Sequence, residues 1–118
     1  MGGKLITVLS GGGGGAKFVD GLSRLTQNFS VIANTGDDIE IYGLHLSPDV
    51  DTLMYTLSGE LDIKKGWGIN KDSFVCQNYL KLLGYEDWIK LGDKDLAVHI
   101  KRTELLKTGK SLTEVTSE

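Results

Sequence analysis

Five consecutive glycines stand beside a lysine near the start of the chain, in the stretch SGGGGGAKF. The stretch before them, residues 4–9, is short, apolar and rich in β-branched residues, which predicts a buried strand. After them, Ala16, Val19 and Leu22 recur at helical spacing and predict a helix over residues 16–25. A glycine loop that opens a helix can turn its backbone N–H groups toward an anion. The stretch therefore favours a phosphate cradle, and a tight turn without a ligand is the alternative.

The glycine run matches no phosphate-binding motif decisively. The dinucleotide-binding form G-x-G-x-x-G, begun at Gly11, ends on Ala16, a permitted variant that a run of glycines meets almost automatically. The P-loop form needs Ser or Thr after its lysine, whereas Phe18 follows Lys17. The phosphate assignment thus depends on the place of the loop between strand and helix. The residues assigned to phosphate or nucleotide in this loop are Gly11, Gly12, Gly13, Gly14 and Lys17.

A second polar cluster follows the next apolar segment. Residues 29–33, FSVIA, predict a strand that ends in the sequence NTGDD. Strand, helix and strand predict a parallel pair with a right-handed crossover, whose ligands bind beyond the carboxyl ends of the strands. Asn34 at this edge joins the phosphate- and nucleotide-binding candidates. Asp37 and Asp38 suit a ribose or a divalent cation, and an ordinary turn without a ligand explains them too.

Two more aspartates open the next predicted helix. In SPDVD, Ser47 suits the N-cap and Pro48 the first helical position, and Gly59 marks the end of the helix. Asp49 and Asp51 then fall in the first turn, where the helix dipole favours acids. That placement accounts for both residues without any ligand.

The rest of the chain predicts secondary structure more than chemistry. Residues 39–46 fit a short strand or an extended loop, residues 72–83 a helix capped by Asp72, and residues 88–91 a strand. A further helix over residues 94–107 stops at Gly109, and the residues expected to face inward are Leu96, Ala97, Ile100, Leu105 and Leu106. Residues 111–114 form a capping box that announces another helix.

Five side chains in this part raise a choice between structure and function. Trp67, between two glycines, either covers an edge of the core or lines a ligand pocket. Cys76 fits a small core residue. The default for His99 and Arg102 is a solvated helix face, together with Lys101.

Composition limits the classes of protein. A chain of 118 residues is one domain or part of one, and its 40% hydrophobic and 25% charged residues are ordinary for a globular protein. The net charge of −3 gives no electrostatic case for binding nucleic acid or an anionic membrane. A single cysteine fits a reducing cytoplasm, and neither a membrane span nor a signal peptide is evident.

The motifs taken together resemble the N-terminal part of the 2-phospho-L-lactate transferases, which act in coenzyme F(420) biosynthesis. The matching stretches are ITVLSGGGGGAKF, NTGDD, LSPDVDTLMYTL, GWGI and LGDKDLAVHIKRTELLKTGKSLTEVT. The resemblance extends from about Ile6 to Thr116. One departure is Gly13, where the family often has Thr.

The resemblance implies a reaction and roles for individual residues. The family moves a phospholactyl or phosphoenolpyruvyl group from a GDP-linked donor to a deazaflavin acceptor, releases GMP and requires Mg²⁺. On this basis Asp51 is the catalytic residue, and Asp51 and Lys90 contact the deazaflavin. The metal candidates become Asp37, Asp38 and Asp49.

The resemblance also sets the expected architecture. It implies an α/β fold, a three-layer Rossmann-like parallel sheet that is incomplete here, because residues 1–118 would form only the N-terminal portion of a single transferase domain. Family members are roughly 2.5 times as long, and they suggest a homodimer. Two alternatives stay open: a nucleotide-sugar-binding regulatory module of a related glycine-loop family, and an inactive truncated fragment. The donor, lactyl or enolpyruvyl, is not distinguished.

Overall fold

A computed structural model describes residues 5–118, so Lys4, the first residue of the predicted N-terminal strand, lies outside the described residues. The chain divides into two compact units. Unit 1 comprises Met1–Asp38 and Ser47–Asn70, and unit 2 comprises Ile39–Leu46 and Lys71–Glu118.

Unit 1 is built on a parallel strand pair. Strand β1 (Ile6–Ser10) lies beside β2 (Phe29–Ala33), with Ile6 opposite Phe29 and Ser10 opposite Ala33. Helix α1 (Gly12–Ser23) connects them, and helix α2 (Pro48–Ser58) ends at Gly59, which adopts a left-handed conformation with φ of 80°. The predicted strand–helix–strand unit with parallel pairing is confirmed.

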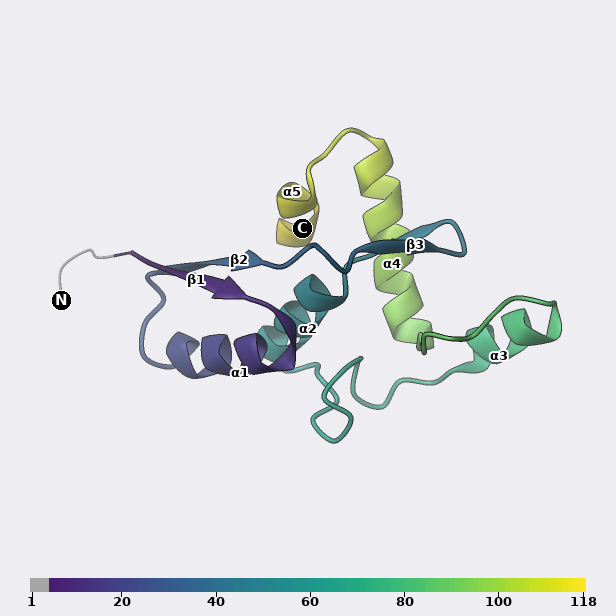
Figure 1. The fold of residues 1–118 in the computed structure, drawn as a ribbon, viewed down its shortest axis with the longest axis horizontal. Helices are drawn as coiled ribbons and strands as arrows, with labels where there is room; N and C mark the ends of the chain where they lie inside the picture. The colour runs from purple at the N-terminus through teal and green to yellow at the C-terminus, as the bar shows by residue number, and fades with distance from the viewer. Residues whose placement is uncertain (1–4) are drawn as a thin grey trace. The chain divides into compact units, whose positions relative to one another are not determined.

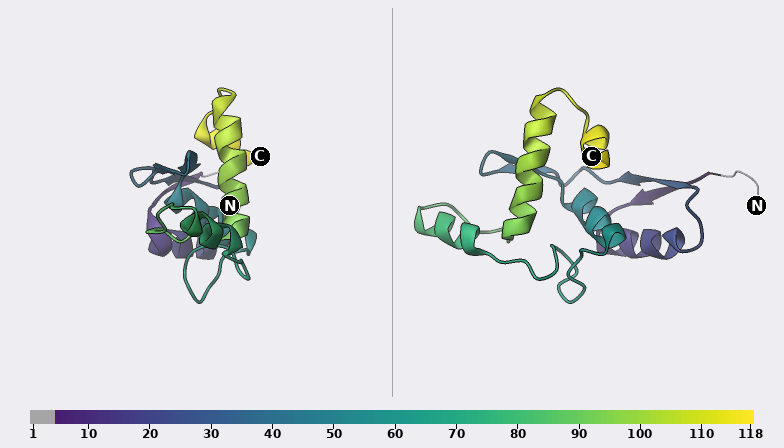
Figure 2. Two further views of the ribbon diagram at one scale, coloured as in Figure 1. Left: turned by 90° about the vertical axis from the view of Figure 1, so that its right-hand side faces the viewer. Right: turned by 180° about the vertical axis from the view of Figure 1, so that it is seen from behind.

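Both helices of unit 1 lie on one face of the strand pair (Figures 1 and 2). Ala16 and Val19 of α1 are buried, as are Val50 and Tyr55 of α2. On α1, Ala16 and Val19 lie three positions apart, which places them on the same side of the helix, and on α2 Tyr55 lies four positions from the buried Asp51. The apolar side chains of two packed helices thus form the interior of the unit.

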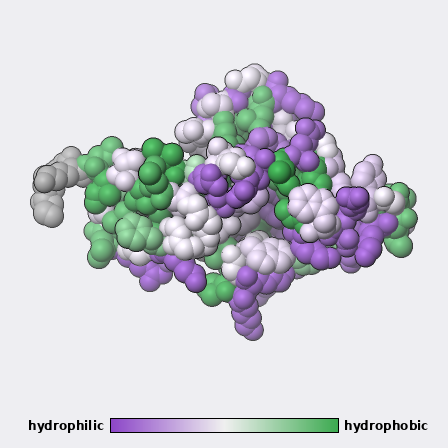
Figure 3. All heavy atoms as spheres, viewed as in Figure 1, coloured by the Kyte–Doolittle hydropathy of each residue, from purple (hydrophilic) through white to green (hydrophobic). Residues whose placement is uncertain are grey.

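The other face of the strand pair is open. Side chains alternate between the faces of a strand, so Leu9 and Ile32 point away from α1 and α2 and are 78% and 58% exposed. Leu5 is exposed as well, and hydrophobic atoms gather over this part of the molecule (Figure 3). Parallel sheets are ordinarily covered on both faces. Of the three expected layers, unit 1 therefore supplies a sheet and one layer of helices.

Unit 2 begins with a hairpin. Strands β3 (Ile39–Ile41) and β4 (Leu44–Leu46) pair antiparallel through the turn residues Tyr42 and Gly43, whose φ values are 54° and 74°. Two positive φ values at the centre of a two-residue loop define the type I′ turn, which matches the twist of the strands. Residues 39–46 therefore form a hairpin of two strands, and neither the single short strand nor the extended loop expected from the sequence.

The hairpin packs on the long helix α4 (Asp93–Lys107). The small core of unit 2 consists of Ile41, Leu46, Leu91 and Leu96. Helix α3 (Val75–Leu82) also contacts α4, and α5 (Leu112–Ser117) follows it. At α5 the predicted capping box is present: the Ser111 hydroxyl oxygen accepts a hydrogen bond from the Glu114 N–H at 3.2 Å.

Several predictions for unit 2 are wrong. Residues 88–91 form no strand; instead the Leu91 N–H donates to the Gln77 side chain at 3.0 Å. Cys76 is exposed rather than part of the core. Ala97 and Ile100 are exposed too, because the buried face of α4 carries polar residues that a hydrophobic pattern does not identify.

Within residues 5–118, no helix is long and apolar enough to cross a membrane.

Candidate functional site

The glycine run is the first turn of a helix and not a loop before it. Gly11 is the extended N-cap residue of α1, with φ of −139°, and the helix begins at Gly12. The first N–H groups of a helix have no partner within it, so those of the glycines are available to a ligand. The helix was predicted to begin at residue 16, which is too late. Glycine is a poor helix former, so a run of glycines does not predict the first helical turn.

The glycines differ in what they permit. A Cβ on Gly15 would lie only 3.1 Å from the Ser10 Cα, so Gly15 allows α1 to pack closely on the end of β1. At Gly13 and Gly14 an added Cβ would meet nothing within 4 Å, and both residues are exposed. The structure therefore has room for the Thr that the family often carries at Gly13.

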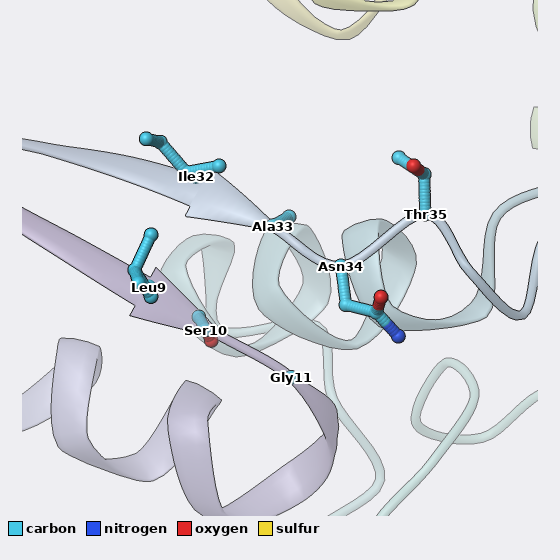
Figure 4. A pocket seen from close by; sticks show the side chains of 7 residues that line it. All are labelled: Leu9, Ser10, Gly11, Ile32, Ala33, Asn34 and Thr35. Carbon is cyan, nitrogen blue, oxygen red and sulfur yellow. The ribbon is translucent and has the colours of Figure 1, made fainter.

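A shallow hollow of about 450 Å³ opens at the carboxyl ends of the two strands (Figure 4). Its lining comes from the last residues of each strand and the residues that follow: Leu9, Ser10, Gly11, Ile32, Ala33, Asn34 and Thr35. This is the edge at which open α/β sheets bind ligands. The glycine end of α1 and the NTGDD sequence are thus brought to one hollow.

Asn34 connects the segments at this edge. Its backbone N–H donates to the Ser10 carbonyl at 2.8 Å, which extends the strand ladder by one bond. Its side-chain carbonyl accepts from the Gly36 N–H at 3.0 Å, and its amide nitrogen donates to Asp49 Oδ2 at 2.8 Å. A Cβ on Gly11 would lie 3.6 Å from the Asn34 Cβ. The ends of β1, β2 and the start of α2 are therefore in direct contact.

A second hydrogen bond links the same segments. The Ser47 hydroxyl donates to Asp38 Oδ2 at 2.7 Å, and Ser47 is fully buried. Ser47 occupies the N-cap position of α2 as predicted, yet its side chain makes no capping hydrogen bond. Because the hydroxyl proton is directed at Asp38, Ser47 joins NTGDD to SPDVD.

The three metal candidates are not equivalent. Asp37 is exposed, while Asp38 and Asp49 are half-buried and hydrogen-bonded as described above. Among the described residues, these three side chains do not gather into a set of ligand atoms within 4.8 Å of one another. A cation at this edge would therefore take its remaining ligands from phosphate or water, as Mg²⁺ commonly does.

Asp51 lies in the first turn of α2, as expected, but it is only 5% exposed. Its N–H donates to the Ser47 carbonyl at 2.9 Å, the first hydrogen bond of the helix. An acid that merely faces a helix dipole gains little from burial, since burial penalises its charge. A buried carboxylate such as that of Asp51 needs polar partners to offset the loss of hydration.

Lys90 belongs to unit 2 and lies on the segment before α4. Its ammonium group is 3.3 Å from Asp87 Oδ2, and that of Lys81 is 3.4 Å from the same oxygen. The hydrogen bond from Lys90, which has the larger effect, and the one from Lys81 hold the pKa of the Asp87 carboxyl below its usual value. Lys90 is exposed, so its position leaves it accessible to a ligand.

Sequence reasoning missed a buried polar row on α4. Asp95, His99 and Arg102 are all buried, so the solvated face expected for His99 and Arg102 is wrong. His99 Nε2 lies 3.3 Å from Asp95 Oδ1, and Arg102 Nη1 lies 3.3 Å from His99 Nδ1. The spacing of four and then three residues, with acid and base at the ends, was a signal that could have identified the row.

Comparison with known proteins identifies the family of the chain. The family model for 2-phospho-L-lactate transferase CofD matches residues 6–118. A 2-phospho-L-lactate transferase of Methanospirillum hungatei is 47% identical over 97% of this chain and 39% of its own length. A phosphoenolpyruvate transferase of Streptomyces avermitilis is 46% identical over 94% of this chain and 36% of its own.

A 2-phospho-L-lactate transferase of Methanocaldococcus jannaschii is 44% identical, again over 94% of this chain and 36% of its own length. The chain thus spans less than two fifths of the length of these relatives. The match of the family model covers nearly every described residue, including the glycine turn, NTGDD and SPDVD. The chain belongs to the 2-phospho-L-lactate transferase CofD family.

Proposed function

We propose that this chain forms the phosphate- and acceptor-binding portion of a transferase in coenzyme F(420) biosynthesis. The donor is a GDP-linked phospholactate or phosphoenolpyruvate, and the acceptor is 7,8-didemethyl-8-hydroxy-5-deazariboflavin. The observation that carries the proposal is the contact of three segments at one strand edge, made by Asn34 with Ser10, Gly36 and Asp49. The relatives named for transfer of phospholactate and of phosphoenolpyruvate lend support to both donors.

The glycine end of α1 is suited to the diphosphate of the donor. Its N–H groups and the positive end of the helix dipole favour phosphate oxygens. Gly13 and Gly14 leave open space at this end, so a diphosphate can approach the backbone closely. Lys17, which is exposed in the same helix, adds a positive charge.

The transfer step is an in-line displacement at phosphorus. The terminal ribityl hydroxyl of the deazaflavin attacks the phosphorus that bears the lactyl or enolpyruvyl group. The bond from that phosphorus to the bridging oxygen breaks, and GMP leaves with the electron pair. Asp51 accepts the proton of the attacking hydroxyl, and Lys90 bonds the acceptor.

A divalent cation fits the carboxylates of this edge. Asp49 and Asp38 each have one oxygen fixed by a neutral donor, which leaves the negative charge of the carboxylate in place. When bound there, Mg²⁺ would neutralise charge on the phosphates of the donor. Asp37, exposed on the same loop, is the third candidate.

A fusion protein tests the proposed transferase activity. The chain is fused to the part of the Methanospirillum hungatei relative that lies beyond the matched region, and GMP is measured with donor, deazaflavin and Mg²⁺. We expect GMP and the phospholactyl-deazaflavin in equal amounts from the fusion, and no turnover by the separate 118-residue chain as a monomer. A folded fusion that binds GDP yet releases no GMP would contradict the proposed transfer.

A further inference from the structure

We infer that Asn34 is a positioning residue, which orients the Asp49 carboxylate toward a divalent cation on the donor phosphates. The inference rests on the proposed function and deepens it. It also revises the role expected for Asn34 from the sequence, where the residue was grouped with the nucleotide-binding candidates.

The side chain of Asn34 is held at both of its polar atoms. Oδ1 accepts the Gly36 N–H at 3.0 Å, and Nδ2 donates to Asp49 Oδ2 at 2.8 Å. The backbone is fixed as well, through the 2.8 Å bond from the Asn34 N–H to the Ser10 carbonyl. Turning the amide toward a phosphate would break the bond to Asp49 or the bond to Gly36. The geometry therefore assigns the side chain to Asp49.

The chemistry of an amide donor suits this task. An amide N–H fixes one carboxylate oxygen without supplying the positive charge that a lysine or arginine would bring, so Asp49 keeps its attraction for a cation. Within residues 5–118, the hydrogen bond of the Asp49 side chain is the one from Asn34, and it engages Oδ2. Oδ1 is then the ligand atom for a cation. Because Mg²⁺ demands nearly ideal octahedral geometry, the orientation of that oxygen affects affinity.

Gly11 supports the same arrangement. A Cβ at Gly11 would lie 3.6 Å from the Asn34 Cβ and 3.8 Å from Asp49 Oδ2, so the N-cap of α1 lies directly against the pair. Phosphate oxygens on the first turn of α1 would thus lie close to the carboxylate that Asn34 orients. A cation between Asp49 and the phosphates would have ligands on both sides.

The test measures Mn²⁺ binding, which needs no turnover. The 118-residue chain is titrated with Mn²⁺ in the presence of GDP and followed by electron paramagnetic resonance. The variants are Asn34→Ala, Asn34→Ser, Asp49→Asn and the double variant Asn34→Ala with Asp49→Asn. Serine retains an acceptor for the turn but is too short to reach Asp49, so Asn34→Ser separates the two bonds of the side chain. Asn28→Ala, an exposed asparagine ahead of β2 at the opposite end of that strand, is the matched control.

We expect both Asn34 variants to bind Mn²⁺ about tenfold more weakly, the usual size of a lost outer-shell partner. In the Asp49→Asn background, Asn34→Ala should cause no further loss, because its effect acts through Asp49. Asn28→Ala should bind as the parent does.

Three results would overturn the inference. Unchanged Mn²⁺ affinity in Asn34→Ser would remove the positioning role while leaving the proposed transferase intact. A loss of GDP affinity in Asn34→Ser with all metal chelated would show that Asn34 contacts phosphate directly. Absence of Mn²⁺ binding in the parent chain with GDP bound would remove the cation from this edge, and with it both this inference and the metal part of the proposed function.

Discussion

Asp72, which precedes α3, caps the start of α4, and Asp93, at the start of α4, caps the start of α3. Asp72, ahead of α3, accepts the N–H groups of Lys94 and Asp95 at the start of α4, at 2.8 and 3.2 Å. Asp93, the first residue of α4, accepts the Cys76 N–H of α3 at 2.9 Å and the Ser73 hydroxyl at 2.6 Å. These hydrogen bonds hold the starts of the two helices together. Because the Asp72 side chain is bonded to α4, it does not cap α3, which begins only at Val75.

Replacing Asp72 by Ala should lower the free energy of unfolding by about 1 kcal/mol, the usual cost of losing an N-terminal cap. The reason is that two N–H groups at the start of α4 lose their acceptor. Urea unfolding followed by circular dichroism measures the change. Lys94→Ala is the matched control, because it keeps the backbone N–H that Asp72 receives. Equal stability of Asp72→Ala and the parent would contradict the capping role.

Asp93 makes the stability of unit 2 dependent on acid. The Ser73 hydroxyl first, and the Cys76 N–H next, hold the pKa of the Asp93 carboxyl below its usual value. A depressed folded-state pKa contributes stability above the unfolded pKa of about 3.9, and that contribution is lost as pH falls through the folded value. The melting temperature should therefore decline below about pH 4.

In Asp93→Asn, part of that acid dependence should disappear, since the amide does not titrate. Scanning calorimetry between neutral and acid pH checks this, with Asp20→Asn as a control that removes a half-buried acid paired with Arg24 on α1. If Asp93→Asn lost stability with acid just as the parent does, the reciprocal cap would not be the titrating feature.

The parts of the fold that were predictable are those set by local rules. Residues 29–33 and the helix of Pro48 were assigned correctly because β-branched runs and N-terminal prolines have few alternatives. The hairpin at Tyr42 was not, because a tyrosine with positive φ is rare and the usual signal of this turn is Asn-Gly. The strand predicted at residues 88–91 does not form, because the Leu91 N–H donates to the side chain of Gln77, a residue distant in sequence, and not to a neighbouring strand.

The site was predictable as a location and less so as a set of roles. The βαβ rule placed the glycines and Asn34 at one edge, and the hollow confirms that these two segments meet there. No local rule reveals that Asn34 would bond Asp49, or that Ser47 would turn its hydroxyl to Asp38 and not to its own helix. Both contacts depend on how α2 approaches β2, which is a property of packing.

Removing Arg102 should destabilise unit 2. Arginine can only donate, so His99 Nδ1 is the acceptor of their 3.3 Å contact, and Nε2 carries the proton that faces Asp95. Arg102→Met keeps much of the volume but deprives a buried ring nitrogen of its donor. The expected loss is about 2 kcal/mol, measured by urea unfolding. Lys101→Met, on the exposed side of the same helix, is the control, and an equally small effect of both variants would rule out a structural role for the row.

The open face of the strand pair should bind apolar probes. Leu9 and Ile32 lie opposite each other in the parallel register and are largely exposed. Replacing both with Ser should reduce the fluorescence of an apolar dye bound by the chain and leave the circular dichroism spectrum unchanged. Thr7→Ala with Ser30→Ala, on the same face, serves as the control. Dye fluorescence that is unaffected by the Leu9 and Ile32 changes would show that the probe binds elsewhere.

Asp51→Asn should abolish most of the transfer activity of the completed fusion protein while preserving its fold. Asparagine keeps the size of the side chain and still suits the first turn of α2, so a purely structural role would survive the change. A carboxylate that takes the proton of the attacking hydroxyl would not survive it, and turnover should fall about 100-fold or more. GMP release is measured together with the melting temperature, with Asp20→Asn as the control. Near-normal turnover at an unchanged melting temperature would return Asp51 to the role of an acid at a helix start, and its burial would then have to be explained by packing alone.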